Sequence, residues 1–355
     1  MTTHFNRMLA MLFAAALLFS CESEDVILPG QNGFFIVNEG AFNHGNSSLS
    51  FLDKSTGLVT NNIFEKATGK PLGDQAQSMT VHDGRGYIVV QNSGKIEVID
   101  VSDYSLLATV EKGVVSPRYF LAVSHSKGYF TDWGADNVSG YIKIMDLETF
   151  TVTDSIDTKD AGANQLIKLN DYVYVSHNGG WGKANTIAVV DWKKDEFVQS
   201  IQTLTNPQSL VEDRNGDIWV TGTGISDYFN PENDTPGFVA KLDTDQNTIA
   251  FSIEAGVTGY ELWPKHITTD RSGENLFFIY NGGVSTLPIT ATAGDKYQQI
   301  IDKSFYGLSV DVSENQLIGL EAKDFTNAGH MFRYSLDGMI LDSLEVGIAP
   351  NSCAF

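Results

Sequence analysis

Basic residues are scarce in this 355-residue chain, which has 23 Lys and Arg against 44 Asp and Glu. The formal net charge is −21. A nucleic-acid partner needs a basic footprint on which its phosphates can bind, so this balance argues strongly against DNA or RNA binding. The acidity implies little else, because a solvated acidic surface is common.

Cysteine is nearly absent, since the chain has only Cys21 and Cys353. Cys21 ends an apolar run near the N-terminus, whereas Cys353 lies in a strand-like stretch at the other end of the chain. Two cysteines in an exported protein can pair, but these two settings differ too much. We therefore expect no disulfide.

The motifs that hold metals or phosphates are also missing. The seven histidines show no H-E-x-x-H spacing, and no cysteine pair accompanies them. The glycine-rich stretches 179–182 and 222–224 lack the strand–helix context and the basic residue of a phosphate loop. Asp132 and Asp136 are close enough in sequence to join a cation site, yet no calcium-loop pattern surrounds them. We expect no metal and no cofactor.

No stretch carries a convincing helical period, and short strand-like runs dominate instead. Residues 95–100 alternate in the period-2 manner of a half-buried strand, and other runs are continuously apolar. The 33 glycines and 11% aromatic residues suit many short strands joined by tight turns. Several of these runs end in an aspartate whose carboxylate can cap the following turn, namely Asp53, Asp100, Asp146, Asp191 and Asp243.

A short stretch recurs along the chain and sets its organisation. Related copies begin at Ala76, Pro117, Ala163, Pro207 and Pro264. They are spaced by about 41 to 57 residues, and a last copy begins at Pro350, about two periods later. In each complete unit the copy comes first and three more strand-like runs follow. A period of about 40–50 residues with several short strands per unit is typical of propeller blades.

The first unit, starting near Phe34, lacks this opening stretch, whereas the chain ends with an unaccompanied copy at 349–355. We therefore predict that the C-terminal tail supplies the missing inner strand of the first blade. The predicted fold class is all-β, a seven-bladed β-propeller over residues 33–355 whose C-terminal strand closes the first blade.

Residues 1–20 are predicted to be a secretory signal. A weakly basic start at Arg7 precedes an apolar run that is too short to span a membrane comfortably. The run ends in Leu18-Phe19-Ser20-Cys21, which resembles a bacterial lipoprotein box and implies a lipidated Cys21. An ordinary signal peptide with an incidental cysteine is the alternative.

The predicted tether, 21–32, begins with the acidic run Glu22-Ser23-Glu24-Asp25. This run resembles the surface-export signal of Bacteroidetes lipoproteins, although a solvated tether explains the composition equally well. With a lipidated Cys21, it implies a protein anchored in the outer membrane and exposed at the cell surface, because acyl chains anchor without spanning.

One repeat carries a family resemblance. Gly94-Lys95-Ile96-Glu97-Val98-Ile99-Asp100 fits the unit G-x-Ile-x-Val-Ile-Asp of the YncE-like propellers, and residues 185–191 fit it loosely. The ending 342–352 looks like that of Bacteroidetes lipoprotein propellers, among which the BtuG-type proteins capture cobalamin for a TonB-dependent outer-membrane transporter. The resemblance covers roughly residues 34–355 and is more specific for fold than for ligand. It implies a corrinoid or another bulky nutrient as the small-molecule ligand, and such a transporter as a partner.

The candidate site follows from blade topology. The loop entering the inner strand and the loop between the second and third strands emerge on the same face of a propeller. That face gathers aromatic, amide and a few charged side chains, which suit a large, partly apolar ligand. The predicted ligand-binding residues are Phe42, His44, Arg118, Trp133, Asn164, His177, Trp181, Gln208, Tyr228, Tyr260, Trp263, His266, Tyr306 and Asn351. The alternatives are interblade packing for the aromatic residues and loop hydrogen bonding for the histidines.

Three classes of function remain open. The preferred one is capture of a ligand without catalysis. A propeller enzyme of the lyase or lactonase type would need a polar metal or acid–base cluster at the channel mouth. A scaffold would dock onto a partner protein through the long loop 222–237.

Overall fold

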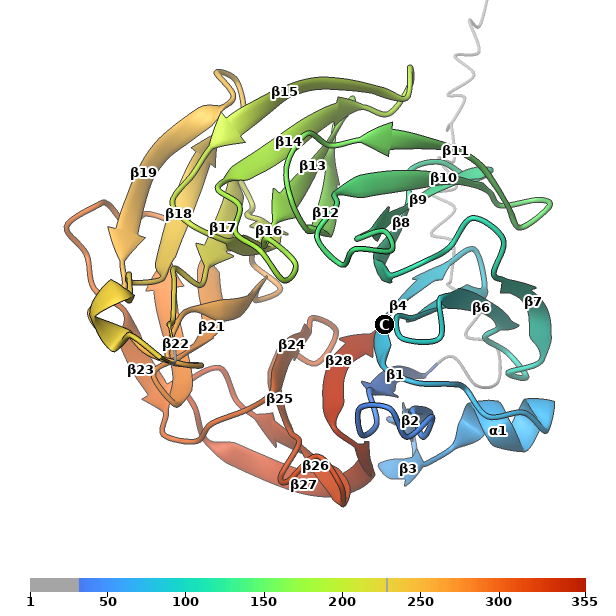
Figure 1. Cartoon of the computed structure of the whole chain (residues 1–355). Coiled ribbons are helices and arrows are strands. Elements are labelled where there is room, and N and C mark those ends of the chain that lie inside the picture. Colours follow the sequence, from blue (N-terminus) through green and yellow to red (C-terminus); the bar gives the residue numbers. More distant parts are fainter. Residues whose placement is uncertain (1–31, 228) are drawn as a thin grey trace, which may run out of the picture.

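Figure 1 shows the computed structural model of the chain, which describes residues 32–227 and 229–355. The predicted signal 1–20, the lipidation site Cys21 and all but the last residue of the tether 21–32 lie outside the described residues. The same holds for Tyr228. No helix within the described residues is long and apolar enough to cross a membrane.

Seven four-stranded antiparallel sheets stand around a central axis, so the predicted seven-bladed β-propeller is confirmed (Figure 1). From the inner to the outer strand, blade 1 consists of β28 (Pro350–Ala354), β1 (Gly33–Asn38), β2 (Ser48–Asp53) and β3 (Leu58–Thr60). Blade 2 consists of β4 (Ala76–His82), β5 (Arg85–Val90), β6 (Lys95–Asp100) and β7 (Leu106–Val110). Blade 3 consists of β8 (Pro117–Ala122), β9 (Lys127–Asp132), β10 (Tyr141–Asp146) and β11 (Thr151–Asp157).

Blades 4 and 5 consist of β12 (Ala163–Leu169), β13 (Tyr172–His177), β14 (Thr186–Asp191) and β15 (Glu196–Gln202); and β16 (Pro207–Glu212), β17 (Ile218–Gly222), β18 (Phe238–Asp243) and β19 (Thr248–Glu254). Blades 6 and 7 consist of β20 (Lys265–Thr269), β21 (Asn275–Tyr280), β22 (Gly283–Pro288) and β23 (Gln298–Ile301); and β24 (Gly307–Asp311), β25 (Gln316–Glu321), β26 (Ala328–Tyr334) and β27 (Ile340–Ile348).

The ring closes through the two ends of the propeller. β28 pairs antiparallel with β1, with Ile36 opposite Cys353 and Phe35 opposite Ala354. Figure 1 shows the last strand of the chain beside the first, at the inner edge of blade 1. The predicted closure by the C-terminal strand is therefore confirmed.

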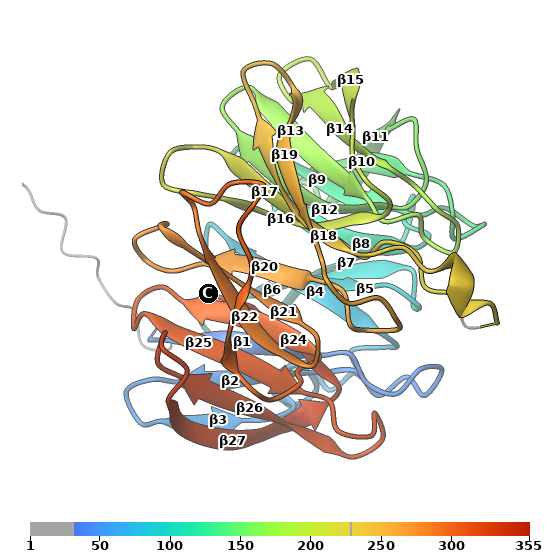
Figure 2. The ribbon, with the colours of Figure 1, turned by 90° about the vertical axis from the view of Figure 1, so that its left-hand side faces the viewer.

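Among the described residues, two short helical elements accompany the strands, and no helical period in the sequence predicted them. The helix α1 (Ile63–Thr68) follows blade 1, and the 3₁₀ turn η1 (Pro231–Asn233) lies in a loop that projects from one side of the ring (Figure 2). Ile63 and Phe64 are buried in the core shared by blades 1 and 2. A helix this short shows no repeating period in the sequence, so burial of its first turn is what fixes it.

Hydrophobic clusters fill the spaces between neighbouring blades. The ring of Tyr87 in blade 2 stacks on Phe120 of blade 3, with 4.2 Å between ring centroids. In blade 5, Trp219 is completely buried, and its indole N–H donates to an Asp213 carboxylate oxygen at 2.9 Å. The middle strands of each blade are covered on both faces, which explains their continuously apolar sequences.

The aspartates at the ends of the third strands cap the turns that follow, as predicted. Asp53 Oδ1 accepts from the Ser55 backbone N–H at 2.8 Å. The same bond recurs from Ser102 to Asp100 and from Lys193 to Asp191. These carboxylates fix the outermost hairpins of the blades.

Polar side chains connect the inner strands around the channel. Ser78 Oγ donates to the Arg118 carbonyl oxygen at 2.8 Å, and Asn164 Nδ2 donates to that of Gln208 at 3.0 Å. Asn351 Nδ2 donates to Gln77 O at 3.1 Å, across the closure of the ring. Inner strands have no strand neighbour on the channel side, so these bonds satisfy part of that edge.

Candidate functional site

A cavity of about 1210 Å³ occupies the centre of the ring. The inner strands of all seven blades contribute to its wall. This volume lies above the usual range of about 300–1,000 Å³ for small-molecule pockets. The channel therefore has room for a bulky organic ligand.

Aromatic side chains stand at the rim of the cavity. Trp181, Tyr260 and Phe42 line it and are 76%, 73% and 58% exposed, respectively. Tyr260 packs edge-to-face on Trp263, with 5.5 Å between ring centroids. Exposed aromatic clusters of this kind are typical of binding surfaces, because they bury a large apolar area when a ligand covers them.

Arg118 of β8 brings a positive charge to the cavity wall. Its guanidinium lies over the Trp133 ring, 4.1 Å from the centroid, and its Nη1 donates to Gln91 Oε1. Trp133 is itself buried, and its indole N–H donates to Ala163 O at 2.9 Å. Burial lowers the pKa of Arg118, but a guanidinium remains charged in proteins. Trp133 thus acts mainly as the platform that orients this cation.

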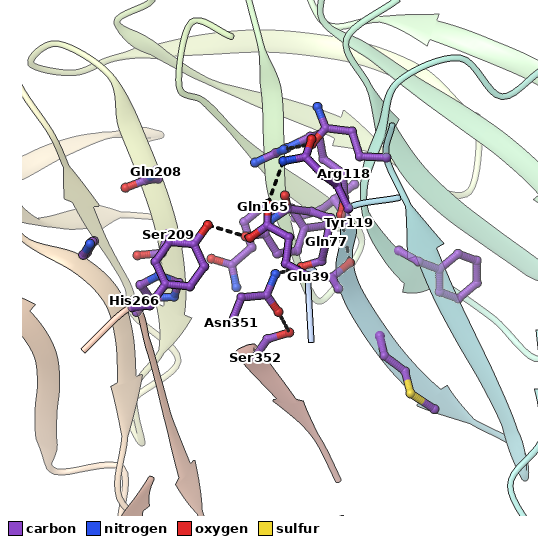
Figure 3. A pocket seen from close by; sticks show the side chains of 18 of the residues that line it. Glu39, Gln77, Arg118, Tyr119, Gln165, Gln208, Ser209, His266, Asn351 and Ser352 are labelled. Carbon is purple, nitrogen blue, oxygen red and sulfur yellow. Dashed lines mark hydrogen bonds between the residues drawn. The ribbon is translucent and has the colours of Figure 1, made fainter. Parts of the chain in front are cut away.

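Glu39, which follows β1, brings a carboxylate to the same space and is only 8% exposed. Its Oε2 accepts from the Tyr306 hydroxyl at 2.5 Å, and its Oε1 accepts from Gln75 Nε2 at 3.1 Å. Burial raises the pKa of Glu39, and the hydrogen bond from Tyr306 opposes that rise. In Figure 3, Glu39, Arg118, Gln77 and Asn351 converge near the channel axis.

Lys265 and His266 come from the start of β20 on the opposite side of the ring. Lys265 is 8% exposed, and its Nζ lies 3.7 Å from Glu261 Oε2. Burial, with a smaller contribution from the Lys265 charge, lowers the pKa of His266 to about 3. His266 is therefore a neutral imidazole at physiological pH, able to donate or accept a hydrogen bond.

Some amide side chains of the cavity wall bond to the protein backbone, and one has an amide oxygen without a hydrogen-bond partner. Gln165 Oε1 accepts from the Leu210 backbone N–H at 2.8 Å, and Asn351 donates to two backbone carbonyls of blade 2. The buried Gln208 Oε1 has no hydrogen-bond partner. A polar atom of this kind costs free energy until a water molecule or a ligand supplies the missing bond.

Comparison with known proteins identifies the family. Residues 32–333 match the family described as "Domain of unknown function (DUF5074)". The chain belongs to the DUF5074 family. Among curated proteins, none matches this sequence.

Solved structures similar to this DUF5074 protein share its fold at low sequence identity. Hydrazine synthase from Kuenenia stuttgartiensis has a TM-score of 0.65 and 14% identity, covering 83% of this chain and 90% of that one. A quinonprotein alcohol dehydrogenase-like protein from Bacteroides thetaiotaomicron has a TM-score of 0.66 and 14% identity, covering 91% and 78%. The periplasmic gluconolactonase of Pseudomonas aeruginosa has a TM-score of 0.64 and 10% identity, covering 90% and 98%. At these identities the likeness establishes the propeller architecture alone.

Most of the predicted site residues of this DUF5074 chain line the cavity, and these are Phe42, Arg118, Trp133, Trp181, Gln208, Tyr260, Trp263, His266, Tyr306 and Asn351. Three others, His44, Asn164 and His177, lie outside the cavity lining. His44 is exposed but lies outside the cavity lining, and Asn164 is buried with its amide on Gln208 O. His177 is fully buried, with Nε2 2.8 Å from Thr158 Oγ1 and Nδ1 3.1 Å from Thr186 O. Both ring nitrogens of His177 therefore have partners within the protein.

Several lining residues are not among the predicted ligand-binding residues, chiefly Glu39, Gln75, Gln165 and Ser209. Glu39 directly follows β1, in one of the loops that blade topology assigns to this face. Its position in that loop is the feature of the sequence that places it at the site. Gln165 lies in a register shift between Ala163 and Leu166, and a bulge of this kind re-aims side chains in a way that periodicity does not predict.

The carboxylates of the two aspartates considered for a cation site accept hydrogen bonds from backbone N–H groups. Asp132 accepts from the N–H groups of Val115, Ser116 and Gly134, and Asp136 accepts from Val138 and Ser139. Within residues 32–227 and 229–355, no group of three or more His, Cys, Asp or Glu side chains is arranged to hold a metal. Both aspartates stabilise loops at the rim.

Proposed function

We propose that this protein captures a bulky, hydrogen-bonding organic ligand in the mouth of its central channel without transforming it. The observation that carries this proposal is the cavity of about 1210 Å³, with exposed aromatic residues at its rim and polar groups at its centre. Aromatic anchors would supply most of the binding free energy by burial, and the polar groups would orient the ligand.

A corrinoid is the first ligand to test. It combines an apolar macrocycle with a rim of carboxamides, which matches aromatic residues beside amide, Arg118 and Glu39 side chains. It carries no strong negative charge that a protein with a net charge of −21 would repel. The resemblance of the repeats to YncE-like propellers, and of the C-terminal ending to BtuG-type lipoproteins, favours the same ligand. Delivery to a TonB-dependent outer-membrane transporter would complete this role.

Calorimetry with cyanocobalamin is expected to give a Kd in the nanomolar range or lower. Binding should also quench the tryptophan fluorescence of the protein. Replacing Trp181 and Tyr260 by Ala should weaken binding at least tenfold each, because aromatic anchors contribute about 2 kcal/mol or more. Tyr172→Ala is the matched control, since Tyr172 is exposed outside the cavity lining. Absence of both heat and quenching at micromolar ligand would remove the corrinoid from consideration.

Lactone hydrolysis is the second candidate function. The cavity holds a buried carboxylate, Glu39, and a neutral imidazole, His266, which are the group types used in acid–base catalysis. The similarity in fold to a periplasmic gluconolactonase motivates gluconolactone as the substrate to assay. Turnover that is lost in Glu39→Gln and kept in Tyr172→Ala would favour the enzyme over the capture protein.

The proposed cellular location also has a direct test. Cys21→Ser is expected to move the protein from the membrane fraction to the soluble fraction, because a lipid on Cys21 would be the anchor. Metabolic labelling with a fatty-acid probe reports the modification itself. Label retained by the Ser variant would show that Cys21 is not the acylated residue.

A further inference from the structure

Arg118 and Glu39 bring opposite charges into one cavity but do not form an ion pair. Both residues line the cavity, and the positive charge of Arg118 lowers the pKa of Glu39, so the two groups interact through space. Among the ion pairs of the described residues, which have N···O separations up to 4.0 Å, none joins Arg118 to Glu39. No guanidinium nitrogen of Arg118 therefore lies within 4.0 Å of a carboxylate oxygen of Glu39, and the part of the cavity between these two side chains is called the gap below.

Each charge is held on its own side of the gap by several contacts. Arg118 is stacked on Trp133 and bonded to Gln91, whereas its buried Nε has no partner. Glu39 is fixed by the Tyr306 hydroxyl and by Gln75, which come from blades 7 and 2. Closing the gap would break these contacts. The site is therefore preorganised to keep its charges apart, which lowers the cost of binding a group between them.

We propose that this gap binds a carboxamide of the ligand, whose carbonyl oxygen accepts from the Arg118 guanidinium and whose N–H donates to the Glu39 carboxylate. This inference deepens the proposed capture function and rests on it for the identity of the cavity as a ligand site. Hydrogen bonds to charged groups are the strong ones, so both halves of the amide gain from this placement. A neutral group also leaves the balance between the two charges unchanged.

A carboxylate or a cation fits the gap less well. A carboxylate could bond to Arg118 but would face Glu39 as a like charge, whereas an amidinium could bond to Glu39 but would face Arg118. Like charges brought together inside a partly buried site are costly, because screening by water is weak there. The pair therefore selects a group that has both a donor and an acceptor.

Three planar probes of nearly the same shape test this selection: benzamide, benzoate and benzamidine. Saturation-transfer NMR on the full soluble domain is expected to rank benzamide first. In Arg118→Gln the preference should shift toward benzamidine, because only the carboxylate remains. In Glu39→Gln it should shift toward benzoate. Each shift should change the ratio of affinities by at least about tenfold, which corresponds to the loss of one charged hydrogen bond.

The control is the exposed pair Arg214 and Glu274, whose side chains form an ion pair outside the cavity lining. Arg214→Gln and Glu274→Gln should leave the ranking unchanged. Benzoate or benzamidine binding best to the parent protein, or a ranking unaffected by both cavity variants, would overturn the inference. Melting curves identify a variant that fails to fold, and the other variant then carries the test. Cyanocobalamin is absent from this experiment, so failure of the corrinoid proposal and failure of this inference remain distinguishable.

Discussion

Deletion of residues 350–355 is expected to yield insoluble protein or to lower the melting temperature by more than about 10 °C. The deletion removes β28, whose backbone pairs with β1 from Asn38 to Phe35. It also removes the Asn351 amide that bonds to Ala76 O and Gln77 O in blade 2. Blade 1 would lose its inner strand, and β1 would expose an unpaired edge on which other chains can add.

A milder change at the same end provides the control. Phe355→Ala removes a half-exposed ring that packs on Phe34, with 5.0 Å between ring centroids, but leaves every residue of β28 in place. We expect this variant to remain soluble and to melt within a few degrees of the parent. A truncated protein that melts as high as Phe355→Ala would contradict the role of β28 as the closing strand.

The architecture could be predicted because its signals are local. The third-strand aspartates Asp53 and Asp191 bond to backbone groups two residues ahead, so each turn is encoded where it forms. The recurring opening stretch gave the blade count and exposed the unmatched C-terminal copy. By contrast, α1 is fixed by burial of Ile63 and Phe64 in the core between blades 1 and 2, and no helical period in the sequence predicts it.

For the candidate site, the sequence could predict which face of the propeller it occupies but not how each side chain is oriented. Blade topology assigns loops to one end of the channel, and residues such as Arg118, Trp181 and Tyr260 do line the cavity. Whether a polar side chain turns into the channel or toward a neighbouring blade depends on partners far away in sequence. Glu39 meets Tyr306 267 positions later, and Asn164 meets Gln208 44 positions later. No sequence spacing encodes such pairs.

Mild acid is expected to destabilise the protein through His266 and His177. The pKa of His266 is about 3 in the folded protein, lowered by burial from an ordinary value of 6.5, and burial also lowers the pKa of His177. A histidine whose pKa is lower in the folded than in the unfolded state supports folding best when it is neutral in both states. Its contribution is complete above 6.5 and is lost as the pH falls toward the folded pKa. For His266 the loss should reach about 2 kcal/mol by about pH 5.

Glu39 acts with the opposite sign. Burial raises its pKa above the ordinary 4.5, so protonation of Glu39 favours the folded state as the pH falls. Exposed carboxylates such as Asp136, whose backbone hydrogen bonds lower its pKa to about 2, lose their contribution only below the ordinary 3.8. Between about pH 7 and pH 5 the histidines therefore lower the free energy of unfolding, and proton uptake by Glu39 opposes that change.

Urea unfolding at about pH 7.5 and about pH 5 measures this dependence as a shift of the midpoint. His266→Gln keeps a neutral polar side chain at both pH values, so its midpoint should fall less on acidification than that of the parent. His44→Gln, at an exposed position outside the cavity lining, should follow the parent. Equal midpoints of the parent at the two pH values would contradict the proposed titration. An acid shift of His266→Gln as large as that of the parent would assign the effect to His177, whose burial lowers its pKa and so resists protonation in the folded state.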